Sequence, residues 1–247
     1  MTMLNRVVHR GLNTQLARRD LIVRPDRAMV TFSFDDIPQT AATIGAALLQ
    51  DAGFRGTFYV AMGLLGTETA LGACATLEDV RRLHLAGHEI GCHTHDHVHA
   101  EETPPQVYER DARRNSAALE SAFPGLQVRN FSYASGSVRV AHKRRLQARY
   151  RSMRGVQMGM LRGVVDRNQL PVHKLYAATA DTESIDRLIA HNCETWGWLV
   201  LYTHDISDTP SPYGCTPALL RAAIGSCVRH GADVLTIDAA LDRLSVV

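Results

Sequence analysis

Short runs of apolar and β-branched residues alternate with helical segments along the 247-residue chain, and this alternation constrains its fold more than any other feature. Strands are expected at residues 29–34, 56–62, 88–92, 128–134, 150–154, 174–179, 198–203 and 233–237. Helices are expected at residues 40–53, 76–88, 104–125, 181–192 and 216–231. About seven strand-then-helix units favour a parallel sheet closed into a (β/α) barrel. No linker interrupts them, so residues 1–247 are predicted to form a single domain.

The ends of three predicted helices carry recognisable capping residues. Thr76 precedes an acidic first turn, and Thr216 is followed by Pro217 at the first turn. Asp181 or Thr182 begins a capping box at the start of the 181–192 helix. These residues mark where the three helices are expected to begin.

Residues 1–27 form a basic amphipathic stretch in which Leu4, Val8, Leu12 and Leu16 are roughly aligned. We expect a helical extension that packs across the open end of the barrel. A helix that lies on a membrane surface or binds a partner is the less favoured alternative.

Composition limits the partners and the compartment. The chain has 27 basic and 25 acidic residues, and this near balance argues against nucleic acid as a partner. No stretch approaches the roughly 18 apolar residues of a membrane span, and residues 1–30 lack a signal-peptide core. Five cysteines without a CxxC pair are read as reduced thiols. A cytoplasmic protein is expected, and homo-oligomerisation is left open.

Three polar clusters follow predicted strands. Asp35 and Asp36 follow the first strand, the histidine-rich segment 93–99 follows the third, and His204 with Asp205 follows the seventh. In a parallel barrel the carboxyl ends of all strands meet at one rim, where catalytic residues gather. The three clusters are therefore predicted to converge on one site.

The segment 93–99, HTHDHVH, has the spacing of a metal site. If the chain turns into a helix after Cys92, His93 and His97 lie one turn apart and can bind one ion. His95 and His99 would form a second pair on another face, whereas on a strand all four would share a face. A short helical turn with one pair as ligands is favoured over a solvated histidine-rich loop.

Two adjacent aspartates suit a division of labour. One carboxylate completes a two-histidine, one-carboxylate metal site, and the other takes a proton from water. The simpler alternative is that one of them caps the following helix. His204 is expected to act as a general acid toward a leaving amine, although taken alone it would be an ordinary loop residue.

These motifs resemble the polysaccharide deacetylases of carbohydrate esterase family four. SFDD at 33–36 is similar to the family's Thr-Phe-Asp-Asp, and GFRGTFYV at 53–60 to its second strand. GHEIGCHTHDH at 87–97 is similar to Gly-His-Glu-Ile-Gly-x-His-Ser/Thr-x-x-His, and WLVLYTHD at 198–205 to the final Leu-x-His motif. The resemblance runs from about residue 28 to residue 240.

The resemblance implies a distorted (β/α) barrel and assigns roles residue by residue. It makes Asp35 the general base, His204 the general acid, and Asp36, His93 and His97 the ligands of a divalent ion, with zinc expected. His95 and His99 match no family ligand.

The middle motifs depart from the family. RNFSYASG at 129–136 stands where the family has Arg-x-Pro-Tyr-Gly. Aligned on Gly136, the tyrosine position falls on Ser135, whose backbone N–H is the expected oxyanion donor. No arginine matches in this alignment, and an alignment on Arg129 and Tyr133 makes the spacing one residue too long. Arg154 at the end of the next predicted strand is the suggested substitute that orients the base.

The predicted function is removal of an N-acetyl group from an amino sugar. Because chitin and peptidoglycan lie outside the cytosol, the expected substrate is an intracellular precursor, a nucleotide- or lipid-linked N-acetyl sugar in surface-polysaccharide biosynthesis. The alternatives are an amidohydrolase that acts on an N-formyl sugar or a ureide, and a catalytically impaired relic that binds metal or glycan.

Overall fold

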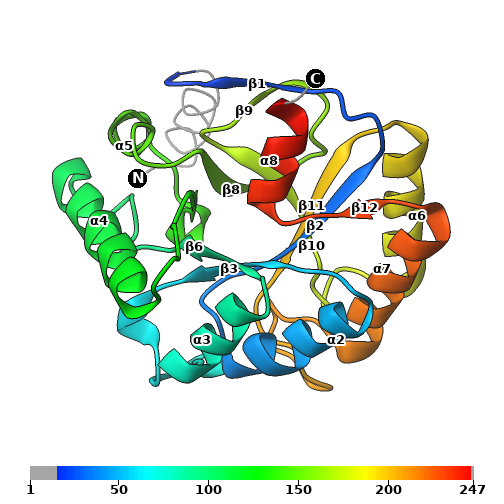
Figure 1. Ribbon diagram of the computed structural model, residues 1–247, viewed down its shortest axis with the longest axis horizontal. Helices are drawn as coiled ribbons and strands as arrows, with labels where there is room; N and C mark the ends of the chain where they lie inside the picture. Colours follow the sequence, from blue (N-terminus) through cyan, green and yellow to red (C-terminus); the bar gives the residue numbers. More distant parts are fainter. Residues whose placement is uncertain (1–15, 246–247) are drawn as a thin grey trace.

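A closed barrel of 7 parallel strands forms the centre of the protein. The computed structural model describes residues 16–245 (Figure 1). The barrel strands are β2 (Met29–Phe34), β3 (Thr57–Val60), β6 (Glu89–Cys92), β7 (Asn130–Ser132), β8 (Ser152–Met158), β10 (Leu170–Lys174) and β11 (Trp198–Thr203). β11 pairs with β2 and closes the barrel, while β12 (Asp233–Val234) pairs with the start of β2. The α/β barrel prediction is confirmed.

Helices surround this barrel on the outside, as Figure 1 shows. They are α2 (Ala46–Asp51), α3 (Leu77–Leu85), α4 (Pro105–Ala122), α5 (Val140–Leu146), α6 (Thr182–Glu194) and α7 (Pro217–His230), and a π-helical turn, η1 (Ala41–Gly45), precedes α2. Short elements occupy the loops: η2 (Met62–Leu64), β4 (Glu68–Thr69), β5 (Gly72–Ala73) and η3 (Ala134–Gly136). β1 (Asp20–Val23) pairs antiparallel with β9 (Gly163–Asp166).

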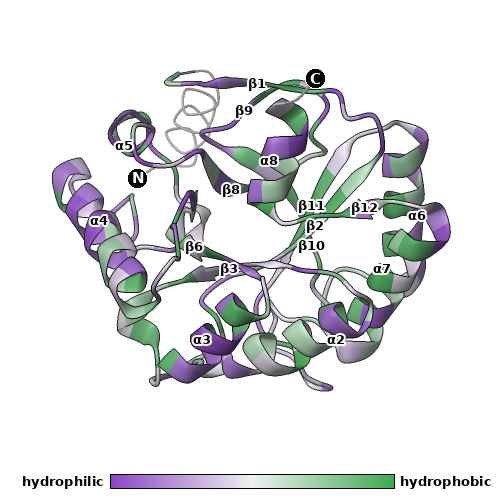
Figure 2. Ribbon diagram, in the orientation of Figure 1, coloured by the Kyte–Doolittle hydropathy of each residue, from purple (hydrophilic) through white to green (hydrophobic). Residues whose placement is uncertain are grey.

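Two apolar layers hold the barrel together. The larger lies between the strands and the outer helices and includes Phe32, Phe58 and Leu201. The smaller contains Tyr59, Trp198 and other residues on the opposite side of the strands. Because successive residues of a strand point to opposite faces, each strand contributes to both layers. In Figure 2 the strands are accordingly mostly hydrophobic, and the outer helices have one hydrophilic face.

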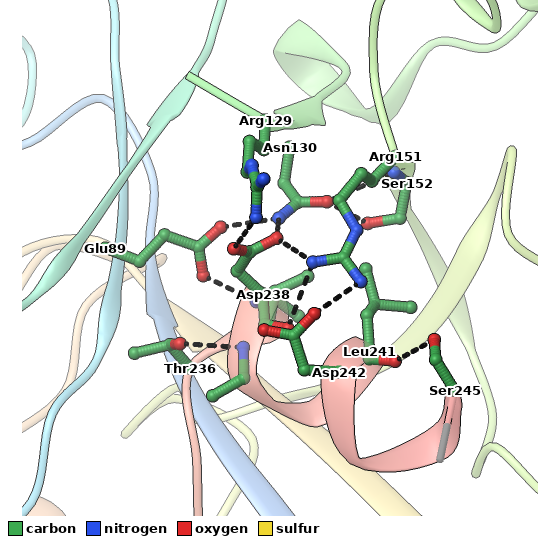
Figure 3. Close-up of polar contacts among 12 residues, drawn as sticks. Glu89, Arg129, Asn130, Arg151, Ser152, Thr236, Asp238, Leu241, Asp242 and Ser245 are labelled. Atoms are coloured by element: carbon green, nitrogen blue, oxygen red, sulfur yellow. Dashed lines mark hydrogen bonds and ion pairs between the residues drawn. The ribbon is translucent and has the colours of Figure 1, made fainter. Parts of the chain in front are cut away.

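The last helix, α8 (Ile237–Ser245), covers the amino-terminal end of the barrel through a polar network (Figure 3). The backbone N–H of Ile237 donates to Thr57 Oγ1 at 3.0 Å, and that of Asp238 donates to Glu89 Oε2 at 2.9 Å. The Asp238 carboxylate also accepts a hydrogen bond from Arg151 at 2.6 Å. These contacts hold α8 over the amino-terminal ends of the strands. The carboxyl ends of the strands, at the opposite end of the barrel, are not covered by α8.

The predicted caps fix the helices where they were expected. Thr76 and Asp79 form a capping box at the start of α3, and Asp181 and Ser184 form one at α6. Thr216 accepts from the backbone N–H of Leu219 at the start of α7. Gly231 ends α7 in the left-handed conformation that glycine adopts readily.

Several elements differ from the prediction. The strand expected at 174–179 lies earlier, at β10, because its buried residues are Leu170 and Val172. β1, β9, α5 and α8 were not predicted. Residues 20–23 of the expected amino-terminal helix form β1 instead, paired with β9, and residues 1–15 of that extension lie outside the described part.

No helix within residues 16–245 has both the length and the apolar character needed to traverse a lipid bilayer.

Candidate metal centre and active site

The loops at the carboxyl ends of the barrel strands bring the three predicted clusters together. Asp35 and Asp36 follow β2, the segment 93–99 follows β6, and His204 follows β11. Several residues in the loops at this end of the barrel have a strained backbone. Positive φ angles between 50° and 62° occur at Asp36, Ile37, Thr94, His97 and Ser135. Such angles are uncommon outside glycine, and they persist at sites that the surrounding structure holds firmly.

Asp36, His93 and His97 converge on a single point. The Nε2 atom of His93 lies 3.1 Å from Asp36 Oδ1, and the Nε2 atom of His97 lies 2.9 Å from the same oxygen. The donor atoms of the three residues all lie within 4.8 Å of one another. Two imidazoles and one carboxylate at this spacing are a set that a divalent transition ion accepts.

The ring of His93 is oriented for binding a cation. Its Nδ1 lies 2.9 Å from the backbone carbonyl of Ser132. A carbonyl only accepts, so Nδ1 carries a proton, and Nε2 is the ring atom that faces Asp36. His93 is 1% exposed, which prevents water from replacing this contact.

The electrostatics of this point fit a bound cation. Asp36 Oδ1 is buried, and neither imidazole contact has the geometry of a hydrogen bond. Burial acts to raise the pKa of Asp36, but the two imidazoles outweigh it, and the net pKa lies below the ordinary value. Burial likewise acts to lower the pKa of His93, and Asp35 and Asp36 outweigh it, so the net pKa is raised. The two carboxylates thus favour a positive charge here, and a metal ion would supply it.

The helical turn predicted for residues 93–99 is wrong. This segment is an irregular loop, because Thr94 and His97 have φ angles of 62° and 52° that an α-helix excludes. The buried carboxylate of Asp111, on α4, accepts the backbone N–H groups of His95 at 2.7 Å and Asp96 at 3.2 Å. This anchor folds the loop back on itself and brings the rings of His93 and His97 to a centroid distance of 5.1 Å.

The other two histidines of the loop contact other partners. His95 Nδ1 lies 2.6 Å from Asp96 Oδ1. These two residues and Asp111 could also group around an ion, but one oxygen of Asp111 already accepts two backbone N–H groups. His99 Nε2 lies 2.9 Å from the hydroxyl of Ser135.

Asp35 is an ionised carboxylate held by one arginine. It is 3% exposed, and Arg154 Nη2 donates to both of its oxygens and to Ser132 Oγ. Burial alone raises the pKa of Asp35, but the Arg154 guanidinium outweighs it and the net pKa is lowered. Asp35 therefore remains charged beside the Asp36 group.

Arg154 lies on β8 and is itself fixed inside the barrel. Its guanidinium carbon lies 5.1 Å from the ring centre of Tyr59 and 5.0 Å from that of Tyr202. Its Nη1 donates to the carbonyl of Gly155 at 2.9 Å. Cations sandwiched between aromatic faces are stabilised when water is excluded. The arginine thus reaches Asp35 from a different strand than the family motif would suggest.

His204, directly after β11, faces the same point. Its Nε2 lies 3.9 Å from Asp36 Oδ2, and its Nδ1 lies 3.2 Å from the backbone carbonyl of Tyr213. The rings of Tyr176, Tyr202 and Tyr213 surround it at centroid distances of 5.8–6.1 Å. No carboxylate within the described residues forms a hydrogen bond with its Nδ1.

Ser135 lies on the rim after β7, in the left-handed conformation with φ 54° and ψ 15°. Its side chain is exposed and contacts His99, so the structure connects it to the histidine loop. No direct contact joins it to Asp35, Asp36 or His204 among the described interactions. Its predicted use of the backbone N–H stays a prediction.

No sequence motif pointed to the tyrosines that line the site. Tyr59 and Tyr202 have hydrophobic neighbours on strands, so each reads as an ordinary core residue. Their role in holding Arg154 follows from barrel closure, which places β3, β8 and β11 around one interior. The alternation of inward-facing positions along each strand would have found them once those strands were placed.

Comparisons with known proteins agree with this fold. Residues 23–153, more than half of the chain, match the family model for polysaccharide deacetylase. No curated protein matches the chain.

Three solved structures illustrate the similarity. The chitin deacetylase of the fungal pathogen Colletotrichum lindemuthianum is 16% identical, with a TM-score of 0.65 over 89% of this chain and 90% of that one. A family 4 acetyl xylan esterase from Clostridium thermocellum, in complex with a cobalt ion, is 18% identical, with a TM-score of 0.58 over 87% and 90%. A family 4 pseudoenzyme from Bacillus anthracis is 15% identical, with a TM-score of 0.60 over 90% and 68%.

At such low identities these structures show a shared fold and no more. The family model, which spans the strand with Asp35 and Asp36 and the histidine loop, decides the assignment. The chain belongs to the polysaccharide deacetylase family.

Proposed function

We propose that the protein is a metal-dependent hydrolase that removes the N-acetyl group from an amino sugar. The observation that carries this proposal is the convergence of Asp36, His93 and His97, with the ionised Asp35 beside them. Hydrolysis of an unactivated amide is helped by an electrophile at the carbonyl, a base for water and an acid for the departing amine. The site offers a group for each of these tasks.

Asp36, His93 and His97 are the residues that would hold the metal. When bound, the ion would polarise the acetyl carbonyl and lower the pKa of water. We propose zinc, because two imidazoles and one carboxylate with room for water are a common catalytic zinc set. The cobalt ion in the acetyl xylan esterase complex supports a divalent metal without identifying it.

Two side chains beside the proposed metal ligands are proposed to carry out the proton transfers. Asp35 accepts a proton from the attacking water, and Arg154 keeps its carboxylate ionised and oriented. His204 donates a proton to the nitrogen of the departing amine through Nε2, the ring atom that faces Asp36 at 3.9 Å. The backbone N–H of Ser135 is proposed to stabilise the developing oxyanion.

The substrate is proposed to be an N-acetylated precursor of a surface polysaccharide, deacetylated in the cytoplasm. Support for the chemistry comes from the family and from the chitin deacetylase with the same fold. The location rests on the sequence alone and is tested by cell fractionation. Recovery of the protein in the extracellular or periplasmic fraction would contradict it.

A panel of acyl donors tests the proposed reaction. The protein is stripped with a chelator, reloaded with zinc, and offered N-acetyl and N-formyl amino sugars, a ureide and an O-acetyl sugar. We expect the zinc-loaded protein to release acetate from the N-acetyl sugar and the stripped protein to release none. Release of formate or ammonia instead would favour an amidohydrolase of another specificity.

The same panel tests the alternative that the protein is a catalytically impaired relic. This alternative is included because one structure of similar fold is a pseudoenzyme. A relic would retain metal by elemental analysis and yet release no product from any donor. The contact between Arg154 and Asp35 argues for an active site, because it holds the base although the family's arginine motif is missing.

A further inference from the structure

The loop between β11 and α7 is closed by a compact set of contacts around Asp205. This carboxylate is 6% exposed. Its Oδ2 accepts the backbone N–H of Ser211 at 2.8 Å, and its Oδ1 accepts the Ser211 hydroxyl at 2.5 Å. The backbone N–H of Cys215 donates to the Asp205 carbonyl at 2.9 Å. Both ends of the loop are therefore tied to one aspartate.

Gly214 completes this closure because no side chain would fit there. A Cβ atom at this position would collide with the Asp205 carboxylate. The backbone N–H of Gly214 donates to the carbonyl of Ser211 at 3.0 Å, and the backbone N–H of Tyr213 donates to Ser211 Oγ at 3.2 Å. The peptide between these two contacts is thus held in one orientation.

The carbonyl of that peptide, which belongs to Tyr213, is the hydrogen-bond partner of the His204 ring. The Tyr213 carbonyl lies 3.2 Å from His204 Nδ1, and it also accepts the backbone N–H of His204 at 3.3 Å. In many sites with a catalytic histidine, a carboxylate fixes the Nδ1 proton and the ring orientation. Here Asp205, the next residue in the chain, uses both of its oxygens on Ser211 instead.

We propose that Asp205, together with Ser211, is a positioning group for His204, acting through the Tyr213 carbonyl. The inference rests on the proposed role of His204 as proton donor. Holding the carbonyl fixes the proton on Nδ1 and directs Nε2 toward Asp36 and the departing amine. Neither Asp205 nor Ser211 touches the reacting atoms.

Two acetyl donors distinguish positioning of an acid from general damage to the site. An N-acetyl amino sugar has an amine leaving group that needs a proton, whereas an aryl acetate has a phenolate that leaves without one. In Asp205→Ala and Ser211→Ala, kcat for the amide should fall roughly 10- to 100-fold with KM changed less than about 2-fold. The rate with the aryl acetate should fall less than about 3-fold, because no acid is required.

His204→Ala is the reference, and Asp208→Ala is the matched control. Asp208 lies on the same loop with an exposed side chain, and its variant should behave as wild type. An equal loss on both donors in Asp205→Ala and Ser211→Ala, or no loss on either, would overturn the proposal. If His204→Ala itself lost both activities equally, the proton-donor role in the proposed function would fail instead.

A measurement independent of turnover checks the geometry. Long-range ¹H–¹⁵N spectra of the histidine rings, with His204 assigned by its alanine variant, should show a proton held on Nδ1 in the wild-type protein. That signal should broaden or disappear in Asp205→Ala and Ser211→Ala and persist in Asp208→Ala. An unchanged His204 signal in both loop variants would show that the loop does not position the ring.

Discussion

Asp35 and Asp36 are neighbours in the chain, but their side chains have different surroundings. Asp36 faces two imidazoles, and Asp35 faces the guanidinium of Arg154. The left-handed backbone at Asp36, with a φ of 59°, turns the two side chains toward different partners. The sequence could predict that the pair lies at the end of a strand, because motifs reveal residue types and spacing, and the division of labour between the two stays a prediction. The sequence could not predict the φ angle, which only the closed barrel imposes.

Replacement of Asp35 by asparagine tests this division. Asp35→Asn keeps the size of the side chain and removes the base, so kcat for acetate release should fall about 10²–10⁴-fold. Metal content should stay near that of the wild-type protein, because Asp36, His93 and His97 are untouched. Asp36→Asn is the matched control and should lose bound metal. Near-normal turnover in Asp35→Asn would contradict the role assigned to Asp35.

His88, outside the site, links stability to pH. It is 3% exposed, and its Nδ1 accepts the backbone N–H of Gly56 at 3.0 Å. Burial, followed by the charge of Arg55, lowers its pKa to about 4. The unfolded chain therefore takes up this proton first as the pH falls from about 6.5, and the folded state loses stability down to about pH 4.

The free energy of unfolding should therefore depend on pH through His88. The His88 contribution should fall by up to about 3 kcal/mol between pH 7 and pH 4. Urea unfolding of wild type and His88→Gln at several pH values should give curves that converge at low pH. His191→Gln reports the effect of removing an exposed histidine. Parallel curves for wild type and His88→Gln would refute the assignment.

At the scale of elements, the site is built by loops whose shape the sequence did not reveal. The spacing of His93 and His97 suggested a helical turn, but Asp111 on α4 holds the loop in another shape. The two histidines nevertheless meet at Asp36, because a motif constrains which residues meet more tightly than it constrains the backbone between them. Helices with clear caps, such as α6 and α7, were placed within a few residues.

The polar network under α8 could not be predicted from local sequence patterns. Glu89 accepts the backbone N–H of Asp238 at 2.9 Å, the hydroxyl of Thr57 at 2.8 Å and the amide of Asn130 at 2.7 Å. The Glu89 carboxylate contacts residues that are distant in sequence, so only the folded barrel reveals its role (Figure 3).

Removal of that carboxylate should loosen α8. Glu89→Ala leaves buried donors without a partner and should lower the free energy of unfolding by about 2–3 kcal/mol. Hydrogen exchange of amides in residues 237–245 should accelerate, while metal content stays unchanged at the opposite end of the barrel. Glu78→Ala, which removes an exposed ion pair with Arg81, should have an effect below about 1 kcal/mol. Unchanged exchange in α8 would contradict the anchoring role of Glu89.

At the scale of the whole molecule, the alternation of strands and helices was sufficient to predict the barrel. Parallel strands buried on both faces read as apolar runs, and β2 and β11 are both of this kind. β10 was misplaced because residues 175–179 are also apolar in part, and the strand was assigned to them. The pairing of β1 with β9 joins residues that are at least 140 positions apart, which no local pattern contains.

Metal binding should stabilise the entire domain, because the proposed ligands come from two separate strand ends. A ligand at about 1,000 times its Kd adds about 4 kcal/mol to the free energy of unfolding. For a chain of this size, that corresponds to a rise in Tm of about 10 °C. Differential scanning fluorimetry with and without chelator should show this difference in wild type. A Tm that does not respond to zinc, or an equal response in Asp36→Ala, would argue against this centre.

The most direct measurement is an anomalous difference map from crystals grown with zinc, with data collected above and below the zinc absorption edge. We expect one strong peak, bounded by a carboxylate oxygen of Asp36 and the Nε2 atoms of His93 and His97, with Asp35 beside it and off the metal. A map with no peak there, or with its peak among His95, Asp96 and Asp111 instead, would contradict the account.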